Sequence, residues 1–463
     1  MSASKTALLD GPILPTLARL TLPNFAAMAI STLVAVCETA YVGQLGTAAL
    51  AGLALAFPLV MLMQMMSAGA MGGSVSSAVS RALGSGDTAR ASALALHAVV
   101  IGASAGLMFT AIFLIFGRDI LAALGGRGVA LAEGLAFANV VFLGAVGIWL
   151  TNTMASILRG SGNMKTPSLV LFCMSLLQIG LGFVLGLGFG PIPRLGMAGV
   201  ALAAVIAFAT GTLAFLWILS SGRAAVRLSF NRSSLSGEMF RDILKVGALA
   251  CTSPVMSVAT ILILTAIIAR FGTEALAGYG IGSRLEFLLV PITFAIGVAS
   301  VPMVGMAIGA GNVARARRAA WTAGLLAAVL MGAIGVVVAI APDAWGRIFT
   351  SDPAVLETSR HYFAAAGPAY FFYGLGLCLY FASQGSGQML GPVLAQSVRL
   401  LIVAIGGWWL VETNAPAWHL FVLIGAAMVA YGLATALGLR LSRWGSERRA
   451  VAIPSSRPSR GEG

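Results

Sequence analysis

The sequence predicts an all-α integral membrane protein with twelve transmembrane helices, arranged as two parallel six-helix lobes. Two observations lead to this fold class. The 463 residues are 59% hydrophobic and only 9% charged, whereas a soluble domain typically carries about 25% charged residues. In addition, matching segments recur at nearly one spacing along the chain, which indicates an internal repeat.

The twelve helices follow from the lengths of the apolar stretches. A helix needs about 20 mostly apolar residues to cross a bilayer. The expected spans are 18–42, 47–79, 91–117, 130–157, 165–189, 195–220, 242–269, 275–308, 316–341, 355–383, 388–411 and 416–440. Several of these stretches exceed the thickness of a bilayer, so we expect tilts, kinks at Pro58, Pro254 or Pro291, or ends that extend beyond the lipid.

Three pairs of segments support the two lobes. GQLGTAALAG at 43–52 matches ARFGTEALAG at 269–278, ALGSGDTARA at 82–91 matches AIGAGNVARA at 307–316, and GSGNMKTP at 160–167 matches GSGQMLGP at 385–392. Each half contains an even number of helices, so both halves enter the membrane from the same side and form parallel repeats. Two such lobes enclose a central cleft, which a transporter requires and a simple pore does not.

Composition shifts set the expected domain boundaries. We expect an N-terminal six-helix lobe over residues 1–222, a cytoplasmic inter-lobe linker over 223–241, and a C-terminal six-helix lobe over 242–441. Residues 442–463 are basic and rich in Pro and Ser, which predicts a disordered cytoplasmic tail.

The positions of the cations predict the orientation in the membrane. Most Lys and Arg residues fall in the two termini and in the loops that lie on the same side as the termini. The opposite loops carry Arg118, Arg127, Arg194, Arg270, Arg347 and Arg360. Cytoplasmic loops are enriched in Lys and Arg, so we expect both termini in the cytoplasm and the protein in the plasma (inner) membrane. This distribution accounts for the net charge of +13 without a nucleic-acid partner.

Cys and His residues give no sign of a metal site or cofactor. Cys37, Cys173, Cys251 and Cys378 stand singly within apolar runs, and the three His residues are far apart. We therefore expect no metal and no cofactor other than a coupling ion. No cluster of intramembrane catalytic residues and no phosphate-binding P-loop is evident, so an enzyme is disfavoured.

Several motifs resemble those of the multidrug and toxic compound extrusion (MATE) family. They are ETAYVGQLG at 38–46, SRALGSG at 80–86, RGSG at 159–162, AGYGIGSRLE at 277–286 and QGSG at 384–387. The resemblance spans about residues 15–440. It implies an exporter that is driven by proton or sodium entry and accepts amphipathic, often cationic compounds.

The sequence departs from the family pattern in its acids. The first helix carries Glu38 where the family usually carries Asp. Many members have acids within helices 7 and 10, but 243–269 contains none, and Glu357 lies near the outer end of helix 10. We therefore expect cation coupling to be concentrated in the first lobe.

Charged residues within membrane helices are costly and usually face a cavity. In the first lobe we expect Glu38 to couple cations, with Asn152 and Gln178 at positions where family members keep polar cation-site residues. A hydrated carboxylate near the interface is the alternative for Glu38, and interhelical hydrogen bonding is the alternative for the amides.

The second lobe provides the other candidates. We expect Glu286, Arg284 and Arg399, with Tyr279 and the first-lobe Gln64, to contribute to substrate binding. A structural ion pair is the alternative for Glu286, and Arg399 lies at a comparable depth. Structural or gating roles are the alternative for Arg284 and Arg399. Arg284 is a poor partner because residues two apart on a helix do not face each other.

The expected function is a secondary-active antiporter that exports small amphipathic compounds by alternating access, most simply as a monomer in contact with membrane lipids. Two buried cations keep open a flippase for a lipid-linked precursor or an exporter of an anionic or zwitterionic metabolite.

Overall fold

The computed structural model describes residues 8–222, 224–228 and 235–444. Within these ranges the chain is helical except for short connections and one isolated β-bridge between Phe189 and Ile192. Ten helices are long and apolar enough to span a membrane, and two bent helix pairs raise the total to twelve. The twelve expected spans are thereby confirmed, and the helices continue through Pro58, Pro254 and Pro291.

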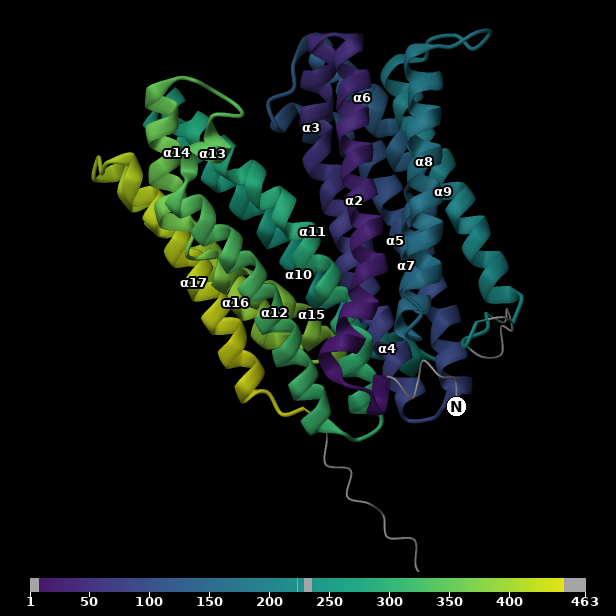
Figure 1. Ribbon diagram of the computed structural model, residues 1–463. Coiled ribbons are helices and arrows are strands. Elements are labelled where there is room, and N and C mark those ends of the chain that lie inside the picture. Colours follow the sequence, from purple (N-terminus) through teal and green to yellow (C-terminus); the bar gives the residue numbers. More distant parts are fainter. Residues whose placement is uncertain (1–7, 223, 229–234, 445–463) are drawn as a thin grey trace, which may run out of the picture.

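Figure 1 shows the helices in two groups, which correspond to the two halves of the chain. The first lobe contains α2 (Ile13–Leu45), α3 (Thr47–Gln64), the π-helix η1 (Met65–Met71), α4 (Gly72–Gly84), α5 (Thr88–Ala123), α6 (Gly128–Leu143), α7 (Ala145–Gly160), α8 (Lys165–Leu187) and α9 (Gly196–Ser220).

The second lobe contains α10 (Gly237–Ile268), the 3₁₀ turn η3 (Ala269–Phe271), α11 (Thr273–Gly309), α12 (Val313–Ile340), α13 (Pro342–Gly346), α14 (Pro353–Ala366), α15 (Tyr370–Ser386), α16 (Leu390–Glu412) and α17 (Ala417–Leu441). α10 begins inside the segment 223–241 that was predicted as a linker, and residues 223 and 229–234 of that segment lie outside the described ranges. Most of the predicted tail, residues 445–463, also lies outside them.

The backbone repeats itself between the lobes at the predicted spacing. The glycines that end the matching turns adopt positive φ in both lobes. In one pair, φ is 87° at Gly86 and 78° at Gly311; in the other, it is 83° at Gly162 and 79° at Gly387. Asp87 caps α5 by accepting from the backbone N–H of Arg90, and Asn312 caps α12 by accepting from that of Arg315. Equivalent residues therefore build equivalent turns.

Both lobes also contain one broken span at the equivalent position. α6 and α7 meet at 50° around Gly144, and α14 and α15 meet at 56° across residues 367–369. A helix break leaves backbone groups without intrahelical partners. In the first lobe, the hydroxyl of Thr110 on α5 donates to the carbonyl of Phe142 at the end of α6, at 2.6 Å.

The two lobes contact each other near the end of the bundle where the described chain starts and stops, here called the terminal end, and diverge toward the opposite end (Figure 1). α4 packs on α11 at this contact. A Cβ added at Gly84 would lie 2.3 Å from the carbonyl oxygen of Met306, and one added at Gly309 would lie 2.1 Å from that of Arg81. These residues are equivalent in the repeat, so the contact is reciprocal, as at a twofold interface.

Hydrogen bonds and ion pairs reinforce the inter-lobe contact. Ser77 Oγ on α4 donates to the carbonyl of Gln384 on α15 at 2.5 Å, and Gln384 Nε2 donates back to the carbonyl of Ala70 at 3.1 Å. At the surface, Asp242 on α10 forms an ion pair with Arg90 at 2.9 Å. The terminal end is thus closed by groups from both halves.

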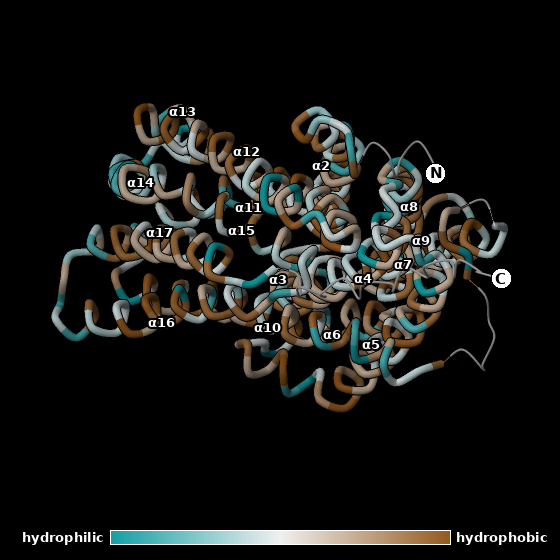
Figure 2. Tube along the Cα trace, turned by 90° about the horizontal axis from the view of Figure 1, so that it is seen from below, coloured by the Kyte–Doolittle hydropathy of each residue, from teal (hydrophilic) through white to brown (hydrophobic). Residues whose placement is uncertain are grey.

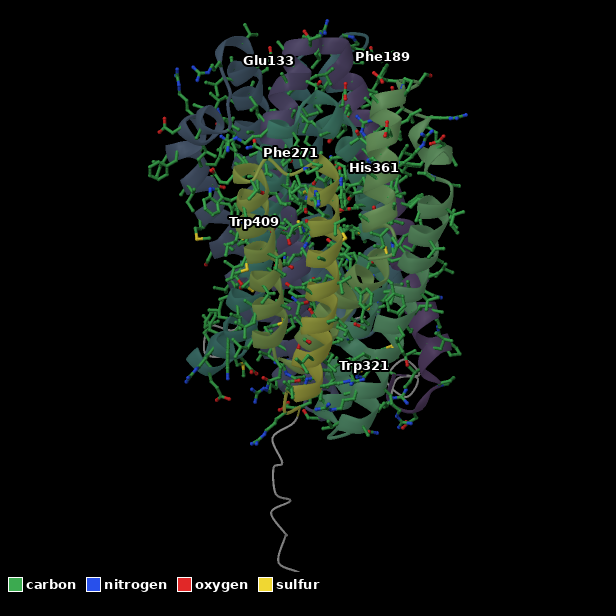
Figure 3. All side chains as sticks on the ribbon, turned by 90° about the vertical axis from the view of Figure 1, so that its left-hand side faces the viewer. Glu133, Phe189, Phe271, Trp321, His361 and Trp409 are labelled. Atoms are coloured by element: carbon green, nitrogen blue, oxygen red, sulfur yellow. The ribbon has the colours of Figure 1, made fainter. Side chains whose placement is uncertain are left out.

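Apolar side chains cover the outside of both lobes, as expected for a surface in contact with lipid. Figure 2, viewed from the terminal end, shows hydrophobic residues along the peripheral helices. Large exposed examples are Leu22, Ile115 and Ile340. Figure 3 places Trp321 near the terminal end and Glu133 and Phe189 at the opposite end, which gives the axis along which the helices run.

Candidate functional site

The first-lobe carboxylate is held by a side chain from another helix. Glu38 lies in the last third of α2, and Gln178 of α8 donates from Nε2 to its Oε1 at 2.7 Å. Three residues further along α2, the hydroxyl of Tyr41 donates to the carbonyl of Ile179 at 3.2 Å. Both side chains of the Glu38–Gln178 pair are half-buried. The structure thus brings these two predicted cation-coupling residues into direct contact.

Asn152 belongs to a separate polar cluster. Its Nδ2 donates to Gln64 Oε1 at 3.0 Å and to Ser67 Oγ at 2.8 Å. Asn152 lies on α7 and is buried, and its partners flank the junction between α3 and the π-helix η1. The structure therefore groups Asn152 with Gln64, which was predicted for substrate binding, and within the described ranges no hydrogen bond joins this cluster to Glu38.

The second lobe contains a cavity of about 160 Å³ whose walls come from α10, α11, α15, α16 and α17. Met61, Met65, Gly69 and Ala70 of the first lobe close one side of it. Three of the predicted substrate residues line this pocket: Tyr279, Glu286 and Arg399. Most of the remaining lining is apolar or aromatic, and the pocket therefore combines a hydrophobic wall with two opposite charges.

Glu286 lies among tyrosines. The hydroxyl of Tyr362, which is buried on α14, donates to Glu286 Oε1. The Tyr362 ring contacts the ring of Tyr279 edge to face at a centroid distance of 5.8 Å, and Tyr370 also interacts with the Glu286 carboxylate. A phenol hydroxyl stabilises a carboxylate in a low-dielectric site by donating a hydrogen bond. Glu286 is thereby fixed with part of its surface in the pocket.

Arg399 provides the positive charge of the pocket. It lies on α16, is only 7% exposed, and its guanidinium carbon is 4.9 Å from the centroid of the Tyr373 ring. This distance corresponds to a cation–π interaction. Among the described residues, no carboxylate lies within 4.0 Å of Arg399, so the structural ion pair with Glu286 that the sequence left open is not formed.

The structure places Arg284 away from the pocket wall. Its side chain is exposed, and its guanidinium carbon is 4.9 Å from the centroid of the Phe349 ring. Arg284 and Glu286 are two residues apart on α11, which turns their side chains to different faces of the helix. Only one of the two predicted arginines therefore contributes to the lining.

The tyrosines are the feature that the sequence reasoning missed. The chain has seven tyrosines, and the six in the second half surround the pocket. Tyr279, Tyr373, Tyr380 and Tyr431 line it. Tyr362 donates a hydrogen bond to Glu286, and Tyr370 interacts with Glu286 electrostatically. A count of tyrosines in each half would have indicated this aromatic site, whereas only Tyr279 was predicted.

The described residues contain no group of three or more His, Cys, Asp or Glu side chains arranged to hold a metal ion. The site consists instead of a carboxylate–amide pair in one lobe and an aromatic pocket in the other. Together with two membrane-spanning lobes, this arrangement defines a transporter.

Comparisons with known proteins also indicate a membrane transporter. The sequence matches the profile of the family described as MatE over residues 23–184 and 250–409. A probable multidrug resistance protein NorM from Thermotoga maritima is 26% identical over 390 residues, which cover 83% of this chain and 82% of that protein. An FAD transporter from Shewanella oneidensis is 24% identical over 402 residues, covering 86% and 88%.

Solved structures share the fold. A MOP superfamily transporter from Pyrococcus furiosus superimposes with a TM-score of 0.86 at 22% identity, over 95% of this chain and 98% of that one. The chain belongs to the MatE family, and is a multidrug-efflux-type membrane transporter rather than an enzyme.

Proposed function

We propose that this protein is a secondary-active antiporter that exports small amphipathic compounds in exchange for entering protons or sodium ions. One observation carries the proposal. A membrane carboxylate held by an amide, Glu38 with Gln178, lies in the first lobe, while the aromatic pocket around Glu286 and Arg399 lies in the second. The two lobes therefore hold separate candidate sites for the coupling ion and the substrate, an arrangement that can support coupled exchange.

Alternating access is supported by the shape of the inter-lobe contact. The lobes are joined at the terminal end and diverge at the other (Figure 1). We place both termini in the cytoplasm of an inner-membrane protein, because the terminal-end loops carry most of the cations. In that orientation the structure is closed toward the cytoplasm, and release to the outside precedes reopening of the α4–α11 contact.

Glu38 is proposed as the coupling residue because a carboxylate can bind a proton or a sodium ion, and because one of its oxygens is already ordered by Gln178 at 2.7 Å. An amide donates to the ionised carboxylate without adding a charge, so the site can still gain a cation. Entry of the cation neutralises Glu38 and changes its interaction with α8.

A second candidate is the export of an anionic or zwitterionic metabolite. Arg399 lines the pocket, and no carboxylate of the described residues lies within 4.0 Å of it. A guanidinium without a carboxylate in contact disfavours a purely cationic substrate. One relative, the FAD transporter from Shewanella oneidensis, carries the name of an anionic aromatic substrate.

The experiment that tests coupling is ethidium efflux from cells that lack their own pumps, comparing wild type with Glu38→Gln. The matched control is Glu357→Gln, because Glu357 is an exposed acid near the outer end of the second lobe. We expect Glu38→Gln to lose gradient-driven efflux and the control to retain it. Proton and sodium gradients applied separately in vesicles identify the ion, and efflux by Glu38→Gln equal to wild type refutes the coupling role.

A further inference from the structure

We propose that the second-lobe pocket is selective for aromatic zwitterions: a planar ring that carries an anionic group for Arg399 and a cationic group for Glu286. The inference rests on the proposed function, since it narrows the substrate of the same pocket. The argument depends on the two charges, on the aromatic walls and on the size of the cavity.

The two charges face one cavity without direct contact. Glu286 and Arg399 both line it, and among the described residues no ion pair of 4.0 Å or less joins them. An isolated charge in a low-dielectric site is costly. A cationic ligand would pair with Glu286 and leave Arg399 unpaired, whereas an anionic ligand would do the reverse. A zwitterion satisfies both groups at once.

Each charge has one side occupied by protein and another available to a ligand. Glu286 Oε1 accepts from Tyr362, but an ionised carboxylate has about four acceptor positions, so it can also accept from an ammonium group. Arg399 places its guanidinium over the Tyr373 ring. One of its N–H groups also binds the Tyr373 side chain. A guanidinium has five N–H donors, so the others remain for a carboxylate or phosphate.

The walls and the volume favour a ring of modest size. Tyr279, Tyr373, Tyr380 and Phe381 contribute aromatic rings to the lining, and such rings pack offset or edge to face against a ligand ring. A cavity of about 160 Å³ suits a one- or two-ring system. A larger substrate would insert only its charged aromatic end here and extend along Met61 and Met65 of the first lobe.

Three indoles of similar size provide the test. L-Tryptophan is a zwitterion, tryptamine lacks its carboxylate, and indole-3-propionate lacks its ammonium group. Equilibrium binding of each radiolabelled compound is measured on the purified protein in detergent. We expect tryptophan to bind wild type at least about tenfold more tightly than either relative, because two charge-assisted contacts form instead of one.

Variants assign each charge to its residue. Arg399→Gln should lose the preference for tryptophan over tryptamine and keep tryptamine binding, which also shows that the pocket is intact. Glu286→Gln should lose the preference for tryptophan over indole-3-propionate and keep binding of the latter. Arg284→Gln is the matched control, because Arg284 is exposed and lies over Phe349, and its three affinities should equal those of wild type.

The outcomes separate this inference from the proposed function. Equal affinities of wild type for the three indoles, no binding of tryptophan, or the same preference in Arg399→Gln as in wild type would overturn the inference. If cells still expel ethidium along an ion gradient, the proposed function stands in each of these cases. The expected binding pattern without gradient-driven efflux of either ethidium or tryptophan supports the pocket assignment and overturns the antiporter.

Discussion

The reciprocal glycine contact between α4 and α11 gives a prediction about the equilibrium between the two states of the transporter. In the structure, a Cβ on Gly309 would lie 2.1 Å from the carbonyl oxygen of Arg81 and 2.9 Å from its carbonyl carbon. Both are backbone atoms of a packed helix, so they cannot move aside as a side chain can. Gly309→Ala therefore disfavours the state in which the terminal end is closed.

The expected size follows from the cost of overpacking. Forcing an extra methyl group into a close-packed contact typically costs about 1–3 kcal/mol, and a free-energy change of that size alters an equilibrium ratio by a factor of about 5 to 150. The contact is present only while the lobes meet at the terminal end. Most of the cost should therefore appear as opening of that end rather than as unfolding.

Double electron–electron resonance (DEER) between two spin labels measures the opening of the terminal end. One spin label replaces Ser220 at the end of α9 and another replaces Leu441 at the end of α17, both exposed and on different lobes. Gly309→Ala should increase the population with the longer distance. Gly280→Ala is the control, because Gly280 also lies on α11 and a Cβ there meets nothing within 4 Å. A variant with a lower melting temperature but an unchanged distance distribution would refute the reasoning.

Two further predictions concern stability. Thr110→Val removes the hydroxyl that donates to the Phe142 carbonyl. We expect the free energy of unfolding to fall by about 1–3 kcal/mol and the melting temperature to fall with it. Thr39→Val is the exposed control, and equal melting temperatures of the two variants would contradict the prediction. At the non-terminal end, two hydrogen bonds from Arg360 lower the pKa of Asp343 below its usual range. Because the pKa is lower in the folded state, the ionised Asp343 stabilises the fold at pH values above the unfolded pKa, and this stabilisation is lost as the pH falls below about 4. Amide exchange in α14 should therefore accelerate below that pH in wild type. Asp343→Asn should show no such pH step.

The spans were predictable from the sequence because apolar length is a local property. The chain carries long runs with few charges, and each expected span coincides with a helix or a bent helix pair. The repeat was also visible, since matching turns need glycine at the same places to reach positive φ. The turns at Gly86 and Gly311 show this directly.

The breaks within two spans were not predictable in the same way. Gly144 is one of 57 glycines, and nothing in its immediate sequence distinguishes it from glycines inside straight helices. Its effect depends on the neighbouring helix α5, whose Thr110 hydroxyl donates to the Phe142 carbonyl. Local sequence does not encode such a contact, which joins residues 32 positions apart.

The site was predicted in part. The high cost of charge in a membrane singled out Glu286 and Arg399, and both line one pocket. The same cost singled out Arg284, but its side chain is exposed. The cost of inserting a charge does not reveal which face of the helix a residue occupies. The contact between Tyr362 and Glu286 could not be predicted from the sequence, since the two residues are 76 positions apart and Tyr362 lies on α14.

The segment of α15 from Tyr380 to Gln384 connects the pocket to the contact between the lobes. Tyr380 lines the pocket, and one helical turn later Gln384 binds the first lobe; Gln384 Nε2 also donates to the Tyr380 hydroxyl at 3.3 Å. At its other end α15 is separated from α14 by the break at 367–369. A ligand that displaces Tyr380 therefore also removes a hydrogen-bond partner of Gln384, and occupancy of the pocket in this way affects a residue that joins the two lobes.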